Sequence, residues 1–244
     1  MRYKTLSIVI PIFNEEPFIS KTIRSVLKSN SLGLQKEIIL IDDGSTDHTG
    51  QKINSFVRKP QNKKRNIDII IINKKKNEGK GKALQSGFLK STGDIVLVQD
   101  ADLEYNPDDY PALLEPFLKN EADVVYGSRF ISDRPHRVLY FWHYLGNVFL
   151  TTFSNILTNL NLTDMETGYK VFRGDLIREV AKKIKSKRFG FEPEITARVA
   201  KIKNIKICEV GISYWGRTYQ EGKKIGIIDG LKAIYQILRF NLFP

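Results

Sequence analysis

Acidic side chains follow three of the apolar segments in the first half of the sequence. Glu15 follows the first segment, Asp42 and Asp43 end the second, and Asp100 and Asp102 follow the fourth. Carboxylates gathered in one place repel one another unless a cation or hydrogen-bond donors compensate them. Mg²⁺ and Mn²⁺ bind through one or two carboxylates together with substrate phosphates. If these residues meet in the fold, they predict a divalent metal beside a phosphorylated ligand.

The spacing of Asp100 and Asp102 suits such a site. One residue separates them, so one carboxylate can face a metal while the other binds a hydroxyl of a sugar or ribose. A calcium loop would require glycine and glutamate where Tyr105 and Pro111 stand. A phosphate-binding loop would require Ser or Thr where Ala83 stands. The first strand also lacks the glycine-rich turn of a dinucleotide-binding fold. A nucleotide diphosphate remains the best-fitting ligand.

The elements that must position these residues alternate between strands and helices. Ile- and Val-rich runs without clear alternation predict strands that are buried on both faces. They cover residues 6–12, 37–41, 67–72, 95–99 and 123–126. Helical patterns follow Pro17 and Asp47. Strands that alternate with helices predict an α/β fold with a mostly parallel sheet, whose ligands bind beyond the carboxyl ends of the strands.

In the second half of the chain, strands and helices no longer alternate regularly. It contains an aromatic-rich helix candidate at 138–157, strands near 169–172 and 205–214, and a final amphipathic helix near 227–240. No Pro/Gly/Ser-rich linker divides the chain. We therefore expect one domain over 1–244, with a nucleotide-binding half at 1–130 and an acceptor- and membrane-facing half at 131–244.

Composition limits the class of protein. The chain has 244 residues, and 39 Lys and Arg against 27 Asp and Glu give a net charge of +12. This charge favours nucleic acid, an anionic membrane or phosphorylated substrates, and much of it would also suit plain solvated surface. A single cysteine, Cys208, excludes an intramolecular disulfide and fits a reducing cytosol. The N-terminal run reads as a strand instead of a signal peptide, and no stretch has the roughly 20 apolar residues of a spanning helix.

An ordered set of motifs resembles the family 2 glycosyltransferases of GT-A fold, and within them the polyprenyl-phosphate branch that includes dolichol-phosphate mannose synthases. The matching stretches span nearly the whole chain. They are IVIPIFNEE, IDDGSTD, NEGKGKALQSGFLKSTGDIVLVQDADLEYNP, DVVYGSR, LTDMETGYKVFR, GFEPEIT and YWGRTYQEGKKIG. The resemblance implies an inverting transfer of a hexose from a nucleotide diphosphate sugar of the GDP-mannose or UDP-glucose type.

The resemblance also implies residue roles at the donor end. Those expected to bind the nucleotide-sugar are Pro11, Phe13, Glu15, Asp42, Asp43, Lys80 and Asp100. The metal, Mg²⁺ or Mn²⁺, is expected at Asp100, Asp102 and Glu104. Asp102 would also take part in catalysis. For Asp42, the Asp-Gly-Ser-Thr-Asp context leaves a turn or helix-cap role equally open.

At the acceptor end, the resemblance assigns Arg129 to the diphosphate or the acceptor phosphate. Asp164 matches an acceptor-loop aspartate that would orient the acceptor or accept a proton. The alternatives are a surface ion pair for Arg129 and a loop cap for Asp164. A phosphate monoester, with a second pKa of about 6, is already largely dianionic at neutral pH and can attack without a base. Arg217, Lys223 and Lys224 are expected to bind lipid or acceptor phosphate.

Two segments are candidates for contact with the lipid of a polyprenyl or dolichyl phosphate. One carries Tyr140, Phe141, Trp142, Tyr144 and Phe149, and the other is the final helix. Aromatic-rich amphipathic helices lie in membrane interfaces, although packing in the core would explain both segments equally well. We expect a peripheral protein on the cytoplasmic face of a membrane, and the sequence leaves open whether a separate anchor protein is needed.

Other functions remain to be weighed against this one. A glycosyltransferase could use a non-lipid acceptor, such as a precursor of a cell-surface polysaccharide. A sugar nucleotidyltransferase would share the nucleotide crevice and metal carboxylates, but an early glycine-rich nucleotide loop is missing. A basic adaptor for nucleic acid gives no reason for Asp100 and Asp102. We therefore expect no nucleic-acid partner.

Overall fold

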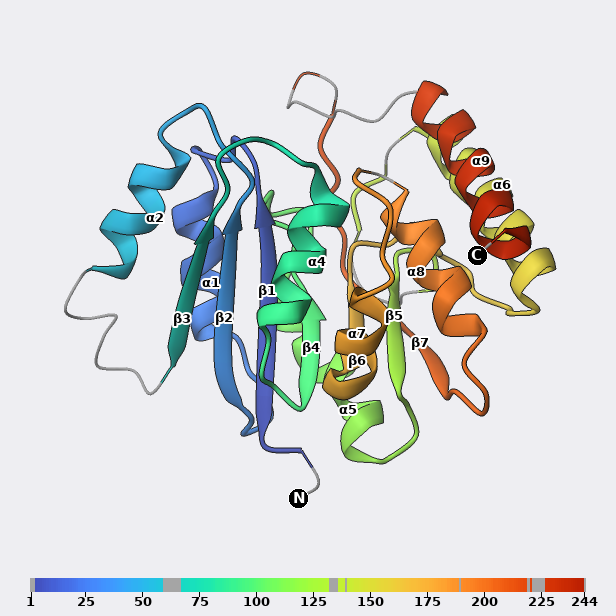
Figure 1. The fold of residues 1–244 in the computed structure, drawn as a ribbon, viewed down its shortest axis with the longest axis horizontal. Coiled ribbons are helices and arrows are strands. Elements are labelled where there is room, and N and C mark those ends of the chain that lie inside the picture. Colours follow the sequence, from blue (N-terminus) through green and yellow to red (C-terminus); the bar gives the residue numbers. More distant parts are fainter. Residues whose placement is uncertain are drawn as a thin grey trace.

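A computed structural model describes residues 3–58, 67–131, 136–138, 140–188, 190–218, 220 and 227–243. Its centre is a sheet with the strand order β3-β2-β1-β4-β6-β5-β7 (Figure 1). The strands are β1 (Thr5–Ile12), β2 (Gln35–Asp42), β3 (Asp68–Asn73), β4 (Ile95–Val98), β5 (Val124–Ser128), β6 (Lys170–Arg173) and β7 (Ile207–Gly211). Only β6 among them runs antiparallel to its neighbours. The prediction of an α/β fold with a mostly parallel sheet is confirmed.

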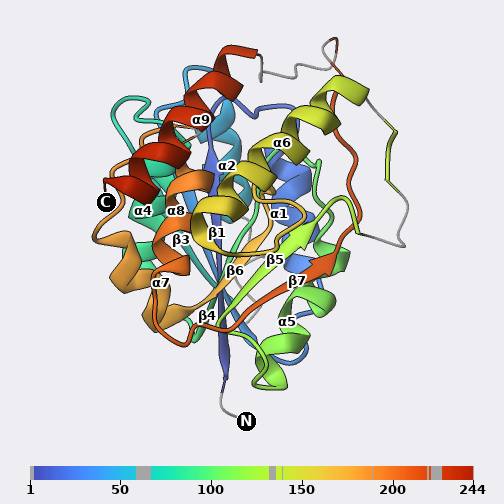
Figure 2. The ribbon, with the colours of Figure 1, turned by 90° about the vertical axis from the view of Figure 1, so that its right-hand side faces the viewer.

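Helices cover both faces of the sheet (Figures 1 and 2). They are α1 (Ile19–Lys28), α2 (Thr49–Val57), α4 (Lys80–Lys90), α5 (Tyr110–Leu118), α6 (Phe141–Thr158), α7 (Gly174–Ala181), α8 (Phe191–Ala200) and α9 (Ile227–Leu242). Alternation along β1 explains the two layers. Ile8 and Ile10 pack into the core beneath α1, α2 and α5, whereas Val9 packs into the core beneath α4, α7 and α8.

Helices α6 and α9 lie side by side at one end of the molecule, and α9 also packs on α8 (Figures 1 and 2). The predicted strand at 205–214 is shorter than expected, because β7 ends at Gly211. Beyond it, the backbone and hydroxyl of Ser213 donate hydrogen bonds to Asp109 Oδ2, at 2.9 and 2.6 Å. The segment after β7 therefore leaves the sheet and returns over its carboxyl edge. Within the described part of the chain, every helix is too short or too polar to cross a membrane.

Candidate active site

The carboxyl ends of β1, β2 and β4 meet at one edge, as predicted, because these strands are parallel neighbours. Loops from β1 and β2 are tied together there. Asn14 Oδ1 accepts a hydrogen bond from the backbone of Thr46 at 2.8 Å, and the backbone of Glu15 donates to Thr49 Oγ1 at 3.0 Å. Pro11 and Phe13 lie partly exposed at the end of β1. These contacts fix the side of the crevice that we assign to the nucleoside.

Asp42 and Asp43 both hold loops in place. Asp42 Oδ1 accepts from the backbone of Ser45 at 2.9 Å, which is the turn role left open by the sequence. Asp43 Oδ2 accepts from the backbone of Gly79 at 2.7 Å. Gly79 has φ +93° and directly precedes α4, and a Cβ there would come within 2.2 Å of the Lys187 carbonyl. Asp43 thereby positions the first residues of α4, and a nucleotide contact for either aspartate stays a prediction.

Arg217 lies between the carboxylates predicted to bind the metal. Its guanidinium is 3.0 Å from Asp102 Oδ2, 3.0 Å from Glu104 Oε1 and 3.8 Å from Glu15 Oε2. The hydroxyl of Tyr214 donates to Glu104 Oε2 at 2.6 Å. The pKa of Asp102 is raised to about 7, first by burial and then by the charges of Asp100 and Glu104, while the charge of Arg217 opposes the rise. Three carboxylates thus share the guanidinium of Arg217.

In the described residues, no three acidic, histidine or cysteine side chains converge around a common point as a metal cage would require. The predicted ligands Asp100, Asp102 and Glu104 are thus not assembled as a set, and Asp100 is bound to Lys80 instead, at 3.0 Å. The residues nevertheless suit Mg²⁺ or Mn²⁺, because both ions accept carboxylate oxygens and complete their shells with phosphates and water. Asp102 and Glu104 share the guanidinium of Arg217, so a further cation at this edge would reduce the repulsion between the two carboxylates.

Arg129 and Asp164 form a buried, two-point ion pair. Nε and Nη2 of Arg129 lie 2.6 and 2.7 Å from the two carboxylate oxygens of Asp164, and the backbone of Arg129 donates to the same group at 3.0 Å. The Asp164 side chain is fully buried, so the alternative of a surface ion pair is wrong. Because Arg129 holds both oxygens of Asp164, the geometry favours positioning over proton transfer. Glu209 fixes the loop by accepting from the backbones of Thr163 and Asp164, each at 3.0 Å.

A cavity of about 280 Å³ opens beside Arg129 and reaches α6. Its walls combine cations, imidazoles and aromatic rings. They are Arg129, Phe130, His136, Arg137, Val138, Tyr140, His143, Tyr144, Asn147 and Tyr214. A phosphate with an apolar tail matches this mixture of cationic and aromatic groups. Sequence reasoning did not single out His136, Arg137 or His143, because neither their spacing nor a motif marks them.

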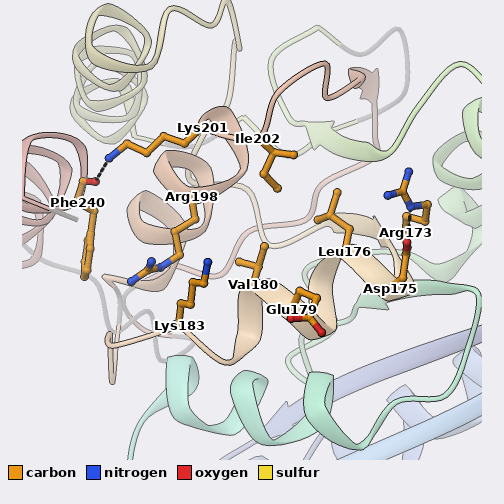
Figure 3. A pocket seen from close by; sticks show the side chains of 10 residues that line it. All are labelled: Arg173, Asp175, Leu176, Glu179, Val180, Lys183, Arg198, Lys201, Ile202 and Phe240. Atoms are coloured by element: carbon orange, nitrogen blue, oxygen red, sulfur yellow. Dashed lines mark hydrogen bonds and ion pairs between the residues drawn. The ribbon is translucent and has the colours of Figure 1, made fainter.

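A larger cavity of about 680 Å³ lies elsewhere, between α7, α8 and the end of α9 (Figure 3). It is lined by Arg173, Asp175, Leu176, Glu179, Val180, Lys183, Arg198, Lys201, Ile202 and Phe240. Lys201 Nζ donates to the Phe240 carbonyl at 2.9 Å and so ties α8 to the end of α9. None of the residues predicted for the site lines this cavity. Lys223 and Lys224 lie outside the described residues.

The aromatic segment of α6 faces outward. Phe141 is 63% exposed and Trp142 76%, and Tyr140, Tyr144 and Phe149 are also exposed. The residues that α6 buries are Thr151 and Ser154. Burial in the core is therefore the wrong explanation for these five aromatic residues. Helix α9 buries some of its apolar residues and exposes others. Ala233, Ile237 and Phe240 are buried, whereas Leu231 and Tyr235 are exposed. Helices α6 and α9, which pack against each other, therefore both expose apolar side chains.

Comparison with known proteins decides the family. Residues 7–181 match the profile described as glycosyl transferase family 2. The chain belongs to this family. It is therefore a glycosyltransferase, and the resemblance inferred from the motifs is confirmed.

Named relatives of this family match along nearly the whole chain. The UDP-N-acetylglucosamine–dolichyl-phosphate N-acetylglucosaminyltransferase of Methanococcus voltae is 25% identical over 251 residues, which cover 99% of this chain and 98% of the relative. The undecaprenyl-phosphate mannosyltransferase of Micrococcus luteus is 28% identical over 244 residues, covering 96% and 93%. Both relatives support the polyprenyl-phosphate branch of the family.

Solved structures also match. Glucosyl-3-phosphoglycerate synthase from Mycobacterium tuberculosis, crystallised with Mn²⁺, uridine diphosphate and glucosyl-3-phosphoglycerate, has a TM-score of 0.72 and 20% identity. The match covers 99% of this chain and 81% of that one. This likeness confirms the predicted GT-A fold.

Proposed function

We propose that the protein transfers a hexosyl group from a nucleotide diphosphate sugar to a polyprenyl or dolichyl phosphate, with Mg²⁺ or Mn²⁺, at the cytoplasmic face of a membrane. The observation that carries the proposal is the adjacency of three parts. Tyr214, which lines the Arg129 cavity, donates to Glu104 beside Asp102, and the same cavity reaches the exposed aromatic residues at the start of α6. The names of the relatives support a lipid phosphate as acceptor.

At the donor end, Asp102 and Glu104 would hold the divalent cation. When bound, this cation stabilises the charge that develops on the leaving diphosphate. Arg217 must then release these carboxylates, which frees its guanidinium to bind phosphate oxygens in the same crevice. Lys80 adds a second positive charge within reach of Asp100. Arg217 and Lys80 would therefore both help to neutralise the charge of the diphosphate.

At the acceptor end, the phosphate would lie in the cavity beside Arg129. Asp164 holds the guanidinium in place, and Tyr214 lies under it, with its ring centre 5.2 Å from Arg129 Cζ. The acceptor dianion needs no base, so a positioned cation is what the reaction requires. Attack opposite to the leaving diphosphate gives inversion at the anomeric carbon.

A panel experiment tests this function. Radiolabelled UDP-glucose, UDP-N-acetylglucosamine and GDP-mannose are each incubated with polyprenyl phosphate and Mg²⁺ or Mn²⁺, and label is counted after organic extraction. We expect one donor to give organic-soluble label whose anomeric configuration is inverted. Parallel reactions replace the lipid with 3-phosphoglycerate or a polysaccharide acceptor and count transferred label in the aqueous phase. Transfer in these reactions alone would replace the lipid proposal with a non-lipid one. Consumption of the nucleotide-sugar with added pyrophosphate, giving a nucleoside triphosphate and a sugar 1-phosphate, would indicate a nucleotidyltransferase.

A further inference from the structure

A group of buried and partly buried charged side chains lies next to the edge that carries the predicted metal ligands. We call Lys80, Asp100, Glu166, Lys170 and Glu192 the inner cluster. Lys80 Nζ joins two of its carboxylates, at 3.0 Å from Asp100 Oδ1 and 3.1 Å from Glu192 Oε1. Lys170 is buried, donates to the carbonyl of Thr167 and lies 5.1 Å from the ring centre of Tyr126. The proposed roles of the donor and acceptor residues account only for Lys80 and Asp100.

Three oxygen atoms of this region have no hydrogen-bond partner among the described residues. They are Glu192 Oε2, Glu166 Oε1 and Thr167 Oγ1, and each is shielded from solvent. The Glu192 side chain is only 6% exposed, and Thr167 is fully buried. Leaving a buried polar oxygen without a donor costs free energy, so such atoms need an explanation. Burial, and next the charge of Glu192, raises the pKa of Glu166 to about 8, which fits a carboxyl group that lacks donors.

The inner cluster lies between the two ends of the proposed crevice. Gly168 holds the loop after Asp164 directly against Asp100, because a Cβ at Gly168 would come within 2.3 Å of Asp100 Oδ2. The backbone of Gly168 also donates to the hydroxyl of Tyr105 at 2.7 Å. Glu166 and Thr167 therefore lie on the loop that runs from Asp164, the partner of Arg129, to Gly168 beside Asp100. In a sugar transfer, the transferred sugar occupies the space between diphosphate and acceptor.

We propose that Glu192, Glu166 and Thr167 form the subsite that binds the hydroxyl groups of the transferred sugar. This inference rests on the proposed function and specifies its donor. The unpartnered oxygens accept hydrogen bonds from sugar hydroxyls, and Lys80 donates to a ring or hydroxyl oxygen while it stays paired with Glu192. A carboxylate oxygen such as Glu192 Oε2 only accepts hydrogen bonds, so it binds a hydroxyl group but offers no donor to a further carboxylate. The transferred sugar is therefore an uncharged hexose, and a hexuronic acid is rejected.

The test separates recognition of the sugar from recognition of the nucleotide. Calorimetry with Mn²⁺ measures the affinities of UDP, GDP, UDP-glucose, UDP-N-acetylglucosamine, GDP-mannose and UDP-glucuronate. We expect Glu192→Gln and Thr167→Val to weaken the best-bound donor about tenfold and to leave its free nucleotide within about twofold. Glu179→Gln removes an exposed carboxylate on α7 and serves as the control that changes neither affinity.

A second readout excludes a purely structural role. Because the Thr167 hydroxyl has no partner in the described chain, Thr167→Val is expected to keep or raise the melting temperature while it weakens donor binding. Equal weakening of donor and free nucleotide, or tight binding of UDP-glucuronate by the wild-type protein, would overturn the subsite. If the wild-type protein bound no nucleotide and no donor at all, the proposed function itself would fail. That result is distinguishable, because it appears before any variant is compared.

Discussion

Replacing Arg217 tests whether its guanidinium occupies the position that we propose for a divalent metal. It pairs with Asp102 and Glu104 at 3.0 Å each, and its side chain is 18% exposed. A hydrogen bond to a charged group contributes about 1.5–3 kcal/mol net at partly buried sites. An incoming cation must offset at least one such contact. Since about 1.4 kcal/mol corresponds to a factor of ten, Arg217→Gln should bind Mn²⁺ roughly 10- to 100-fold more tightly than the wild-type protein.

The assay is Mn²⁺ binding without nucleotide, followed by the electron paramagnetic resonance signal of the free ion. Arg217→Lys keeps the positive charge and is expected to stay close to the wild-type affinity. Arg58→Gln removes an exposed arginine at the end of α2 and controls for net charge. Turnover of Arg217→Gln should fall even as the metal binds more tightly, because the guanidinium no longer reaches the diphosphate. Unchanged Mn²⁺ affinity in Arg217→Gln would show that Arg217 and the metal do not compete.

Three further outcomes follow from particular contacts. Asp164→Asn breaks a buried ion pair, so we expect urea unfolding to show a loss of about 3–5 kcal/mol and turnover to fall; full turnover would refute the positioning role. Asp94 accepts hydrogen bonds from the backbones of Lys4 and Thr5, which lower its pKa although desolvation opposes them. The folded pKa of Asp94 therefore lies below the unfolded value of 3.8, so these hydrogen bonds stabilise the fold at neutral pH and lose their effect as the carboxylate is protonated in acid. Asp94→Asn should lower the free energy of unfolding by about 1 kcal/mol at pH 7, a value reduced for the solvent exposure of the group, and by less as the pH falls below 3.8. Trp142→Ser should weaken flotation with anionic vesicles about tenfold or more, because burial of an aromatic side chain contributes about 1.5–3 kcal/mol, and unchanged flotation would contradict membrane contact through α6.

The strands and their carboxyl edge were predictable from sequence for a simple physical reason. Parallel strands buried on both faces appear as continuous runs of Ile and Val, and their C-terminal ends must share one edge. This rule places Asp42, Asp43, Asp100 and Asp102 together from the sequence alone. The antiparallel position of β6 was not predictable in this way, because its four residues carry no pattern that indicates direction.

Long-range contacts were the part that sequence could not provide. Arg217 reaches Asp102 across 115 positions, and this contact depends on Ser213 drawing the chain away from β7. Glu192 stood inside a recognised motif, but nothing in the motif indicated that one of its oxygens is buried without a partner. A sequence pattern reports the chemical type and spacing of residues. Whether a polar atom is buried, and whether it has a hydrogen-bond partner, depends on the complete fold.

The outward face of α6 illustrates the same limit. Apolar residues at helical spacing describe an amphipathic helix without saying which side is covered. In the structure, Thr151 and Ser154 face inward, and the Thr151 hydroxyl accepts from the backbone of Met165 at 3.1 Å. This inward hydrogen bond leaves Phe141, Trp142 and Phe149 exposed. An apolar surface beside the Arg129 cavity is what a lipid-bearing acceptor requires.

The most direct test of metal-dependent transfer to a lipid phosphate compares two lipids that differ by one phosphate. The protein is incubated with its labelled donor and Mn²⁺, and with either polyprenyl phosphate or the corresponding polyprenol, and organic-soluble label is counted. We expect label with the phosphate, none with the alcohol, and loss of label when a chelator removes the metal. Equal transfer to both lipids, or transfer that survives complete removal of the metal, would contradict this expectation.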